Sequence, residues 1–197
     1  TPSSSRREGL SQFIVDMATP GIEVRPILLL SGEHHFNEVV LDDVVVPPSG
    51  LLGTPGQGWA QVTAELADER GGPERYMSTL PLIREFARAV PAAGSHTAAV
   101  GRLAAGIWAV RAMSREVADL VDQGRTPTLQ AALTKHVGTE FEQRSIDVVR
   151  GSLPDGPQPG SELARHLASA VLHSPGFTLR GGTTQILRSI GSTKLGM

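Results

Sequence analysis

The sequence predicts a mainly α-helical fold in which an antiparallel helical bundle follows a shorter β segment. Before residue 53, apolar residues alternate with polar ones or gather in β-branched runs, as they do in strands. After residue 54, apolar residues recur every three or four positions, which is the period of a helix with one buried face. Since helices joined by short loops pack as antiparallel neighbours, we expect these helices to form a bundle.

Three short strands are expected in the first part of the chain. Residues 22–27 alternate apolar and polar side chains, and residues 36–41 and 44–46 are rich in β-branched or other apolar residues. A Thr-Pro-Gly turn signal that ends at Gly21 precedes them, and two consecutive prolines follow them. We therefore place a β domain over residues 1–53 and a helical domain over residues 54–197.

The helices are expected in order along the second domain. The first begins with Trp59, Val62 and Leu66, which are three and four residues apart. A long helix should end at Gly124, because glycine often directly follows a helix; its buried stripe is predicted to be Val100, Leu103, Ile107, Val110, Val117 and Val121. Later helices are expected over 129–149, 163–171 and 184–190, with apolar positions that include Leu133, Phe141, Leu163 and Val171. The Ala-rich stretch 87–99 is interpreted as a loosely packed connection.

The composition is that of a globular protein and disfavours several functions. Hydrophobic residues make up 40% of the chain and charged residues 19%, which suits a packed core. A net charge of −2 gives no electrostatic basis for binding nucleic acid or an anionic membrane. The absence of cysteine fits a cytoplasmic protein, and no apolar run approaches the length of a membrane span. The six histidines lack the spacing of a metal site, so no metal is expected.

One carboxylate stands out in the helical pattern. Glu69 lies three residues after Leu66 and is therefore expected on the apolar face of the first helix. Burial penalises the ionised form of a carboxylate and makes it a stronger base, as general base catalysis requires. The alternative is a structural ion pair with a basic group such as Arg70 or Arg75. The Gly-Gly-Pro sequence after Arg70 is also able to end the helix and move Glu69 off that face.

Two stretches of the chain resemble the acyl-CoA dehydrogenase family. Residues 36–47 (FNEVVLDDVVVP), with Leu-Leu-Gly at 51–53 and Gly-Gln-Gly-Trp at 56–59, resemble the passage from that family's middle β domain into its C-terminal bundle. Residues 181–188 (GGTTQILR) resemble the closing glycine turn and final helix. The resemblance implies that residues 1–53 are the end of a β-barrel or β-sandwich domain and that residues 54–197 are the C-terminal helical bundle domain.

The resemblance also implies a chemistry. Members of the family use FAD to oxidise an acyl-CoA thioester to the trans-2-enoyl-CoA, and a carboxylate removes the α-proton. In many members the base directly precedes the final Gly-Thr, but that position is Gly181 here, which has no side chain. A minority, including isovaleryl- and long-chain-specific enzymes, carry the glutamate on the first bundle helix before an arginine. Glu69 matches that place and is the expected catalytic base; Arg70 is the expected substrate-binding neighbour, with a salt bridge as the alternative.

The closing turn is expected to contact the cofactor. By resemblance, Gly182, Thr183 and Gln185 bind FAD. The alternative is that Thr183 or Thr184 only caps the final helix and the glycines only make the turn. The family further implies an acyl-CoA substrate, electron-transferring flavoprotein as the electron acceptor, and a homo- or hetero-oligomer, either dimer or tetramer.

Three departures from the family pattern qualify this assignment. The Arg-x-x-Phe-Gly segment that reaches the flavin pyrophosphate is missing from residues 84–99, and the usual Gly-Gly-x-Gly is replaced by residues 150–156. The N-terminal helical domain and the strand over the flavin ring are absent from this sequence, which we expect to continue upstream. In these losses the chain resembles family members that are built from two different subunits, which often act on steroid-type CoA thioesters. The alternative function is therefore a non-catalytic partner subunit that supplies an interface and part of the flavin site.

Overall fold

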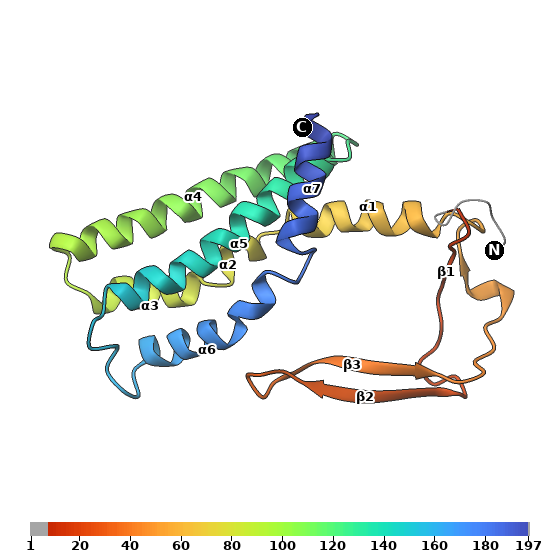
Figure 1. The fold of residues 1–197 in the computed structure, drawn as a ribbon, viewed down its shortest axis with the longest axis horizontal. Helices are drawn as coiled ribbons and strands as arrows, with labels where there is room; N and C mark the ends of the chain where they lie inside the picture. The colour runs from red at the N-terminus through yellow and green to blue at the C-terminus, as the bar shows by residue number, and fades with distance from the viewer. Residues whose placement is uncertain (1–7, 197) are drawn as a thin grey trace. The chain divides into compact units, whose positions relative to one another are not determined.

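The structure is a computed structural model that describes residues 8–196 and leaves the side chains of residues 67, 68 and 195 undescribed. It divides into two compact units, residues 1–65 and residues 66–197. The first contains the strands and the second most of the helices (Figure 1). The mainly α fold with a helical bundle after a β segment is therefore confirmed.

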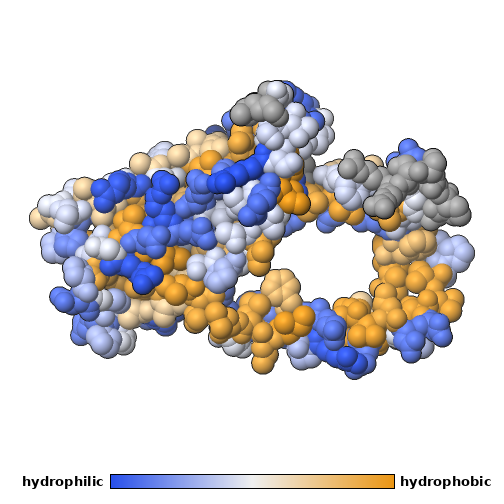
Figure 2. Space-filling model, in the orientation of Figure 1, coloured by the Kyte–Doolittle hydropathy of each residue, from blue (hydrophilic) through white to orange (hydrophobic). Residues whose placement is uncertain are grey.

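The first unit is built on an antiparallel hairpin. Strands β2 (Ile22–Leu28) and β3 (His34–Leu41) pair with Ile22 opposite Leu41, while the short strands β1 (Gln12–Phe13) and β4 (Leu51–Leu52) pair separately. Apolar side chains on the hairpin remain exposed, as the orange patches along it in Figure 2 show. They are Val24, Ile27, Leu28, Phe36, Val39 and Leu41.

The third expected strand, over residues 44–46, does not form. Asp43 just before it has a positive φ of 48°, a left-handed conformation that interrupts an extended strand. The prediction was wrong because β-branched residues favour a strand only where a neighbouring strand supplies hydrogen bonds. A one-turn 3-10 helix, η1 (Pro48–Gly50), follows instead.

The first helix begins inside the first unit. Helix α1 spans Gly58–Arg70. The amide N–H of Gly58 donates to the carbonyl of Leu10 at 2.9 Å, and the side-chain amide of Gln61 donates to the carbonyl of Leu52, also at 2.9 Å. These bonds tie the start of α1 to the β segment, which is why the first unit extends to residue 65.

The second unit is a bundle with α5 (Thr128–Gly151) at its centre, in contact with its neighbours on several sides (Figure 1). Its other elements are α2 (Glu74–Met77), α3 (Leu80–Ala89), α4 (Gly94–Asp122), α6 (Glu162–Phe177) and α7 (Thr184–Leu195). The core cluster comprises Leu82, Ile83, Phe86, Ala99, Leu103, Val110, Phe141, Ile146, Val149, Leu163 and Phe177. Among the described residues, no helix is both long and apolar enough to cross a membrane.

The helix predictions hold in part. Leu103, Val110 and Val117 on α4 are buried as expected, whereas Val121, Leu133 and Val171 are exposed although the helical period placed them on buried stripes. The stretch 87–99 is not the loosely packed connection that its alanine content suggested. It contains the end of α3 and the first turns of α4, and Ala99 is only 1% exposed. Alanine is a strong helix former, and here its small side chain permits close packing.

Two glycines of α4 provide a test of this packing. A Cβ at Gly106 would lie 2.4 Å from the Phe141 ring, whereas a Cβ at Gly101 would meet nothing within 4 Å. Alanine at an open helix position usually gains ~0.5–1 kcal/mol over glycine, and overpacking costs ~1–3 kcal/mol. We expect Gly106→Ala to be less stable than Gly101→Ala by at least ~1 kcal/mol in urea unfolding. Equal stabilities would show that α4 does not pack against α5 as described.

Candidate active site at the end of helix α1

The last turn of α1 presents Glu69 and Arg70 on different sides of the helix. Val62 and Leu66 are half-buried and Arg70 is 8% exposed, so the buried stripe continues at four-residue spacing to Arg70. Glu69 lies beside this stripe and its side chain is exposed. The expectation that Glu69 faces the core is therefore wrong, because residue 70 rather than residue 69 continues the stripe.

The glycine turn before α7 has the backbone that only glycine adopts easily. Gly181 and Gly182 have φ angles of +66° and +105°. The side chain of Thr183 caps α7 by accepting a hydrogen bond from the N–H of Ile186, and Gln185, the second residue of the helix, is exposed. The capping role considered for Thr183 is thus present, and it leaves the hydroxyl proton of Thr183 available to another acceptor.

These two regions meet although they are far apart in the sequence. Nε of Arg70 donates a hydrogen bond of 2.9 Å to the carbonyl of Gly181, 111 residues away. Nη2 of Arg70 also lies 3.5 Å from the position that a Cβ on Gly182 would occupy. The structure therefore brings the Glu69–Arg70 pair and the 181–183 turn together at one end of the bundle.

A cluster of buried charges lies directly beneath this meeting point. It comprises Arg75, Lys135 and Glu142, at 1%, 0% and 0% exposure. Ser78 and Arg180 both donate to Oε1 of Glu142. Nζ of Lys135 donates to the hydroxyl of Thr139 and to the carbonyl of Phe177, the latter at 2.8 Å. We refer to Arg75, Lys135 and Glu142, together with the partly exposed Arg180 that pairs with Glu142, as the buried ionic cluster.

Burial controls the proton affinity of this cluster. It raises the pKa of the Glu142 carboxyl, against the opposing effects of the Ser78 hydrogen bond and the nearby cations. It also lowers the pKa of Lys135 from the usual 10.5 to about 8, and the positive charge of Arg75 adds to that lowering. Burial lowers the pKa of Arg75 as well, and the carboxylate of Glu74 opposes it. Burial therefore disfavours the charged form of all three groups, and neighbouring charges of opposite sign offset part of this effect.

Sequence reasoning overlooked the buried ionic cluster. Lys135 and Glu142 lie seven residues apart, two turns along the same face of α5, with Thr139 between them at four and three residues. Polar residues that share a helical face with the core residues Ala131 and Ile146 are the signal that could have revealed it. Arg75 and Arg180 lie on other elements, and only the tertiary fold places them there.

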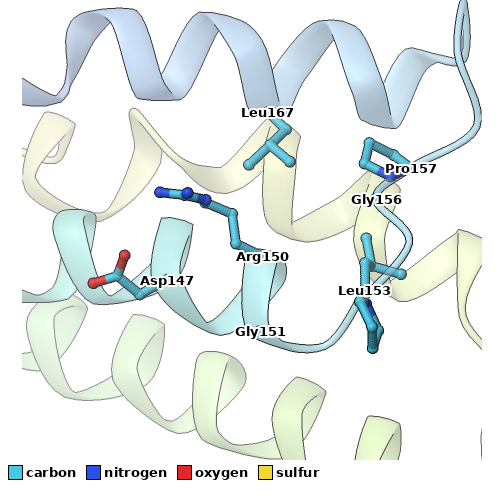
Figure 3. A pocket seen from close by; sticks show the side chains of 8 residues that line it. Asp147, Arg150, Gly151, Leu153, Gly156, Pro157 and Leu167 are labelled. Atoms are coloured by element: carbon cyan, nitrogen blue, oxygen red, sulfur yellow. The ribbon is translucent and has the colours of Figure 1, made fainter.

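A separate hollow at the other end of α5 contains no predicted site residue. It has a volume of about 470 Å³ and is lined by Asp147, Arg150, Gly151, Leu153, Pro154, Gly156, Pro157 and Leu167. Figure 3 shows Asp147 and Arg150 projecting from α5 with Leu167 opposite on α6. The Pro/Gly-rich loop after α5 forms its rim. None of the described contacts connects this hollow to the end of α1.

Comparison with known proteins identifies related chains. The family model described as "Acyl-CoA dehydrogenase, C-terminal domain" matches residues 56–195. The acyl-CoA dehydrogenase FadE34 of Mycobacterium tuberculosis is 29% identical over 197 residues, covering 98% of this chain and 27% of that protein. The acyl-CoA dehydrogenase FadE29 of the same organism is 29% identical, covering 96% of this chain and 52% of that protein. This chain therefore spans about half, or less, of the length of these relatives.

A solved structure supports the fold alone. Butyryl-CoA dehydrogenase from Megasphaera elsdenii superposes with a TM-score of 0.81 at 21% sequence identity. The match covers 100% of this chain and 54% of that chain. The resemblance noted in the sequence therefore agrees with both the family model and the three-dimensional structure.

The buried ion pair allows a test of stability. Glu142→Ala should cost ~3–5 kcal/mol because it leaves Arg180 and Lys135 without their buried counter-charge. Arg180→Met should also destabilise the fold, and the double variant should be more stable than the sum of the two losses predicts. Glu162→Ala, which removes the exposed pair with Arg165, is the control and should cost much less, because water and salt screen an exposed pair. Guanidinium unfolding provides the values, and equal losses for Glu142→Ala and Glu162→Ala would contradict the assignment.

The lowered pKa of Lys135 predicts a pH-dependent stability. Between about pH 8 and pH 10.5 the unfolded chain holds a proton that the folded chain has released, so folding should become more favourable as the pH rises. Relative to Lys135→Met, the wild type should gain about 1 kcal/mol of unfolding free energy per pH unit in this window. Urea unfolding at a series of pH values measures the gain. The exposed Lys194→Met is the control, and parallel curves for wild type and Lys135→Met would refute the prediction.

Proposed function

Because this chain belongs to the acyl-CoA dehydrogenase family, we propose that it takes part in the FAD-dependent α,β-dehydrogenation of an acyl-CoA thioester, with Glu69 as the catalytic base. The observation that carries the proposal is the hydrogen bond from Arg70 to the carbonyl of Gly181. It places the Glu69–Arg70 pair next to the turn whose counterpart contacts the flavin in the family. The substrate and acceptor of the whole protein are part of this proposal, because the chain spans only part of its relatives.

The exposure of Glu69 is compatible with this role. A general base must come within hydrogen-bond distance of the proton that it removes, and an accessible carboxylate can do so. The bound thioester and surfaces outside this chain would then exclude water from the Glu69 carboxylate and make it a stronger base. Arg70 is largely buried and donates a hydrogen bond to the carbonyl of Gly181. Its proposed role is to fix the end of α1 to the 181–182 turn and to present its remaining N–H groups to the substrate.

Position 181 is a poor location for the base. Gly181 has no side chain, and a Cβ added there would lie 2.9 Å from Nη2 of Arg75 and 3.3 Å from Cε of Lys135. A carboxylate at that position would also stand beside two cations, which favour the ionised form and weaken its basicity. These contacts support Glu69 as the base by disfavouring the alternative.

The residues of the closing turn fit one side of a flavin site. Gly182 adopts a backbone that favours glycine, the Thr183 hydroxyl proton is available, and the side chain of Gln185 is exposed at the start of α7. The first N–H groups of a helix of this length suit an acceptor such as the carbonyl and nitrogen atoms of the flavin ring. Gly182, Thr183 and Gln185 would hold FAD on this side, the cofactor would supply the hydride-accepting chemistry, and the carboxylate of Glu69 would remove the α-proton. Electron-transferring flavoprotein is the acceptor that we propose for the reduced cofactor.

A partner-subunit role is the second candidate. The segment before α4 lacks the Arg-x-x-Phe-Gly pattern whose arginine reaches the flavin pyrophosphate in the family, and the loop after α5 lacks the glycine pattern. In that case the chain would assemble with a related chain, supply an interface, and contribute part of a shared flavin site without performing the proton transfer.

Substitution of the base separates the two candidates. Glu69→Gln in the purified flavoprotein should slow the bleaching of the flavin by acyl-CoA by ~10²-fold or more while the flavin stays bound. Glu65 is an exposed carboxylate one turn earlier on α1, so Glu65→Gln is the matched control. Its flavin should be reduced at the wild-type rate. A rate for Glu69→Gln close to that of the wild type would reject Glu69 as the base. Flavin binding only after addition of a second, homologous chain would favour the partner-subunit role.

A further inference from the structure

The carbonyl groups at the end of α1 are held by side chains from two other helices. The last carbonyls of a helix have no partner within the helix and need donors from elsewhere. Nη2 of Arg75 donates to the carbonyl of Glu69 and Nε of Arg75 donates to the carbonyl of Arg70, both at 3.3 Å. Oγ of Ser114 donates to the next carbonyl, that of Gly71, at 2.6 Å. Three consecutive carbonyls therefore each accept a hydrogen bond from a buried side chain.

The two donors are themselves fixed by packing. Arg75 lies on α2 at 1% exposure, and its Cβ is only 2.7 Å from the position that a Cβ on Gly138 of α5 would take. Ser114 lies on α4 at 9% exposure. The residue after α1 is equally confined, since a Cβ on Gly71 would lie 2.3 Å from Val117 of the same helix α4. The end of α1 is thus enclosed by α2 and α4, and α5 supports Arg75 from behind.

Arginine suits this position better than lysine. A guanidinium carries several N–H groups in a rigid plane, so it can donate to two neighbouring carbonyls at once, whereas an ammonium is a single point of charge. A cation at the C-terminal end of a helix also interacts favourably with the helix dipole. Glu74 pairs with Nη2 of Arg75 at 3.0 Å, and Glu142 lies close enough to compensate its charge further.

We propose that Arg75 and Ser114 are positioning residues that fix the backbone of Glu69 relative to the 181–182 turn. Arg75 holds the carbonyl of Glu69 itself, and its Nη2 lies directly beside Gly181. Arg70 completes the link by donating to the carbonyl of Gly181. The distance between the proposed base and the proposed flavin turn is therefore set by backbone contacts, while the carboxylate of Glu69 remains free to meet the substrate. This inference rests on the proposed role of Glu69.

Conservative variants test the positioning role. In the purified flavoprotein, Arg75→Lys should lower the rate of flavin reduction at least tenfold and Ser114→Ala at least threefold. The apparent affinity for the acyl-CoA and the flavin content should change less than twofold, because both side chains are buried inside the bundle. The probe is whichever thioester, straight-chain or steroid-type, bleaches the wild-type flavin fastest. In the cofactor-free protein, amide hydrogen exchange over residues 66–72 and 180–184 should become at least tenfold faster.

Matched variants separate positioning from stability. Ser145→Ala removes a buried serine that donates to the carbonyl of Phe141 within α5, at 2.7 Å. It should lose stability as Ser114→Ala does, yet keep the wild-type reduction rate and the wild-type exchange at the end of α1. Arg84→Lys, an exposed change on α3, should alter nothing. If Arg75→Lys does not fold, Ser114→Ala alone decides the matter.

The outcomes distinguish this inference from the proposed function. The positioning role is overturned if the folded Arg75 and Ser114 variants reduce the flavin within twofold of the wild-type rate. It is also overturned if amide exchange over residues 66–72 is unchanged. In both cases Glu69→Gln would still be inactive, so the proposed function would stand. If Glu69→Gln itself reduces the flavin at the wild-type rate, the proposed function fails first. Faster exchange together with an unchanged reduction rate would show that Arg75 and Ser114 only stabilise the fold.

Discussion

The hydrogen bond between Arg70 and the carbonyl of Gly181 joins two segments that lie 111 residues apart, and much of the site depends on it. One segment ends α1 and the other begins α7. Neither segment could hold its position alone, because a helix end and a glycine turn are both regions where backbone groups lack regular partners. Here the N–H groups of Arg70 and Arg75 donate hydrogen bonds to the carbonyls that lack backbone partners.

The guanidinium groups that supply these hydrogen bonds are buried, and removing their charge from water costs free energy. Arg75 and Lys135 are almost completely enclosed, and Glu142 is the carboxylate beneath them. A buried ion pair is weak evidence for stability, since apolar residues of similar volume often replace one without loss. Within the described part of the chain, Nη1 of Arg75 and Oε2 of Glu142 are buried without a hydrogen-bond partner. We interpret the cluster as a means of fixing geometry at the end of the bundle rather than as a source of folding energy.

The sequence predicted the fold class and most of the helices because helical periodicity is a local signal. Leu103, Val110 and Val117 follow the period and are buried. Prediction from the sequence failed where the outcome depended on distant residues. In the described part of the chain the run 44–46 has no partner strand. Glu69 lies beside the buried stripe, because Arg70 takes the inward position. Thr183 shows an intermediate case, in which the predicted cap is present and the predicted flavin contact remains a prediction. The ionic cluster could not be foreseen in full, since its members come from two helices, α2 and α5, and from the turn before α7.

The crowding at Gly181 has a consequence for how such proteins can change over evolutionary time. Family members differ in where they carry the base, and moving it from the first bundle helix to the glycine turn looks like two independent substitutions. In this chain they are not independent, because a new side chain at 181 would collide with the guanidinium of Arg75. Arg75 would have to shift or be replaced, which would disturb the carbonyls that it holds. Under the proposed assignment of Glu69 as the base, a transfer of the base to position 181 would therefore alter the contacts at the end of α1 as well as those at the turn.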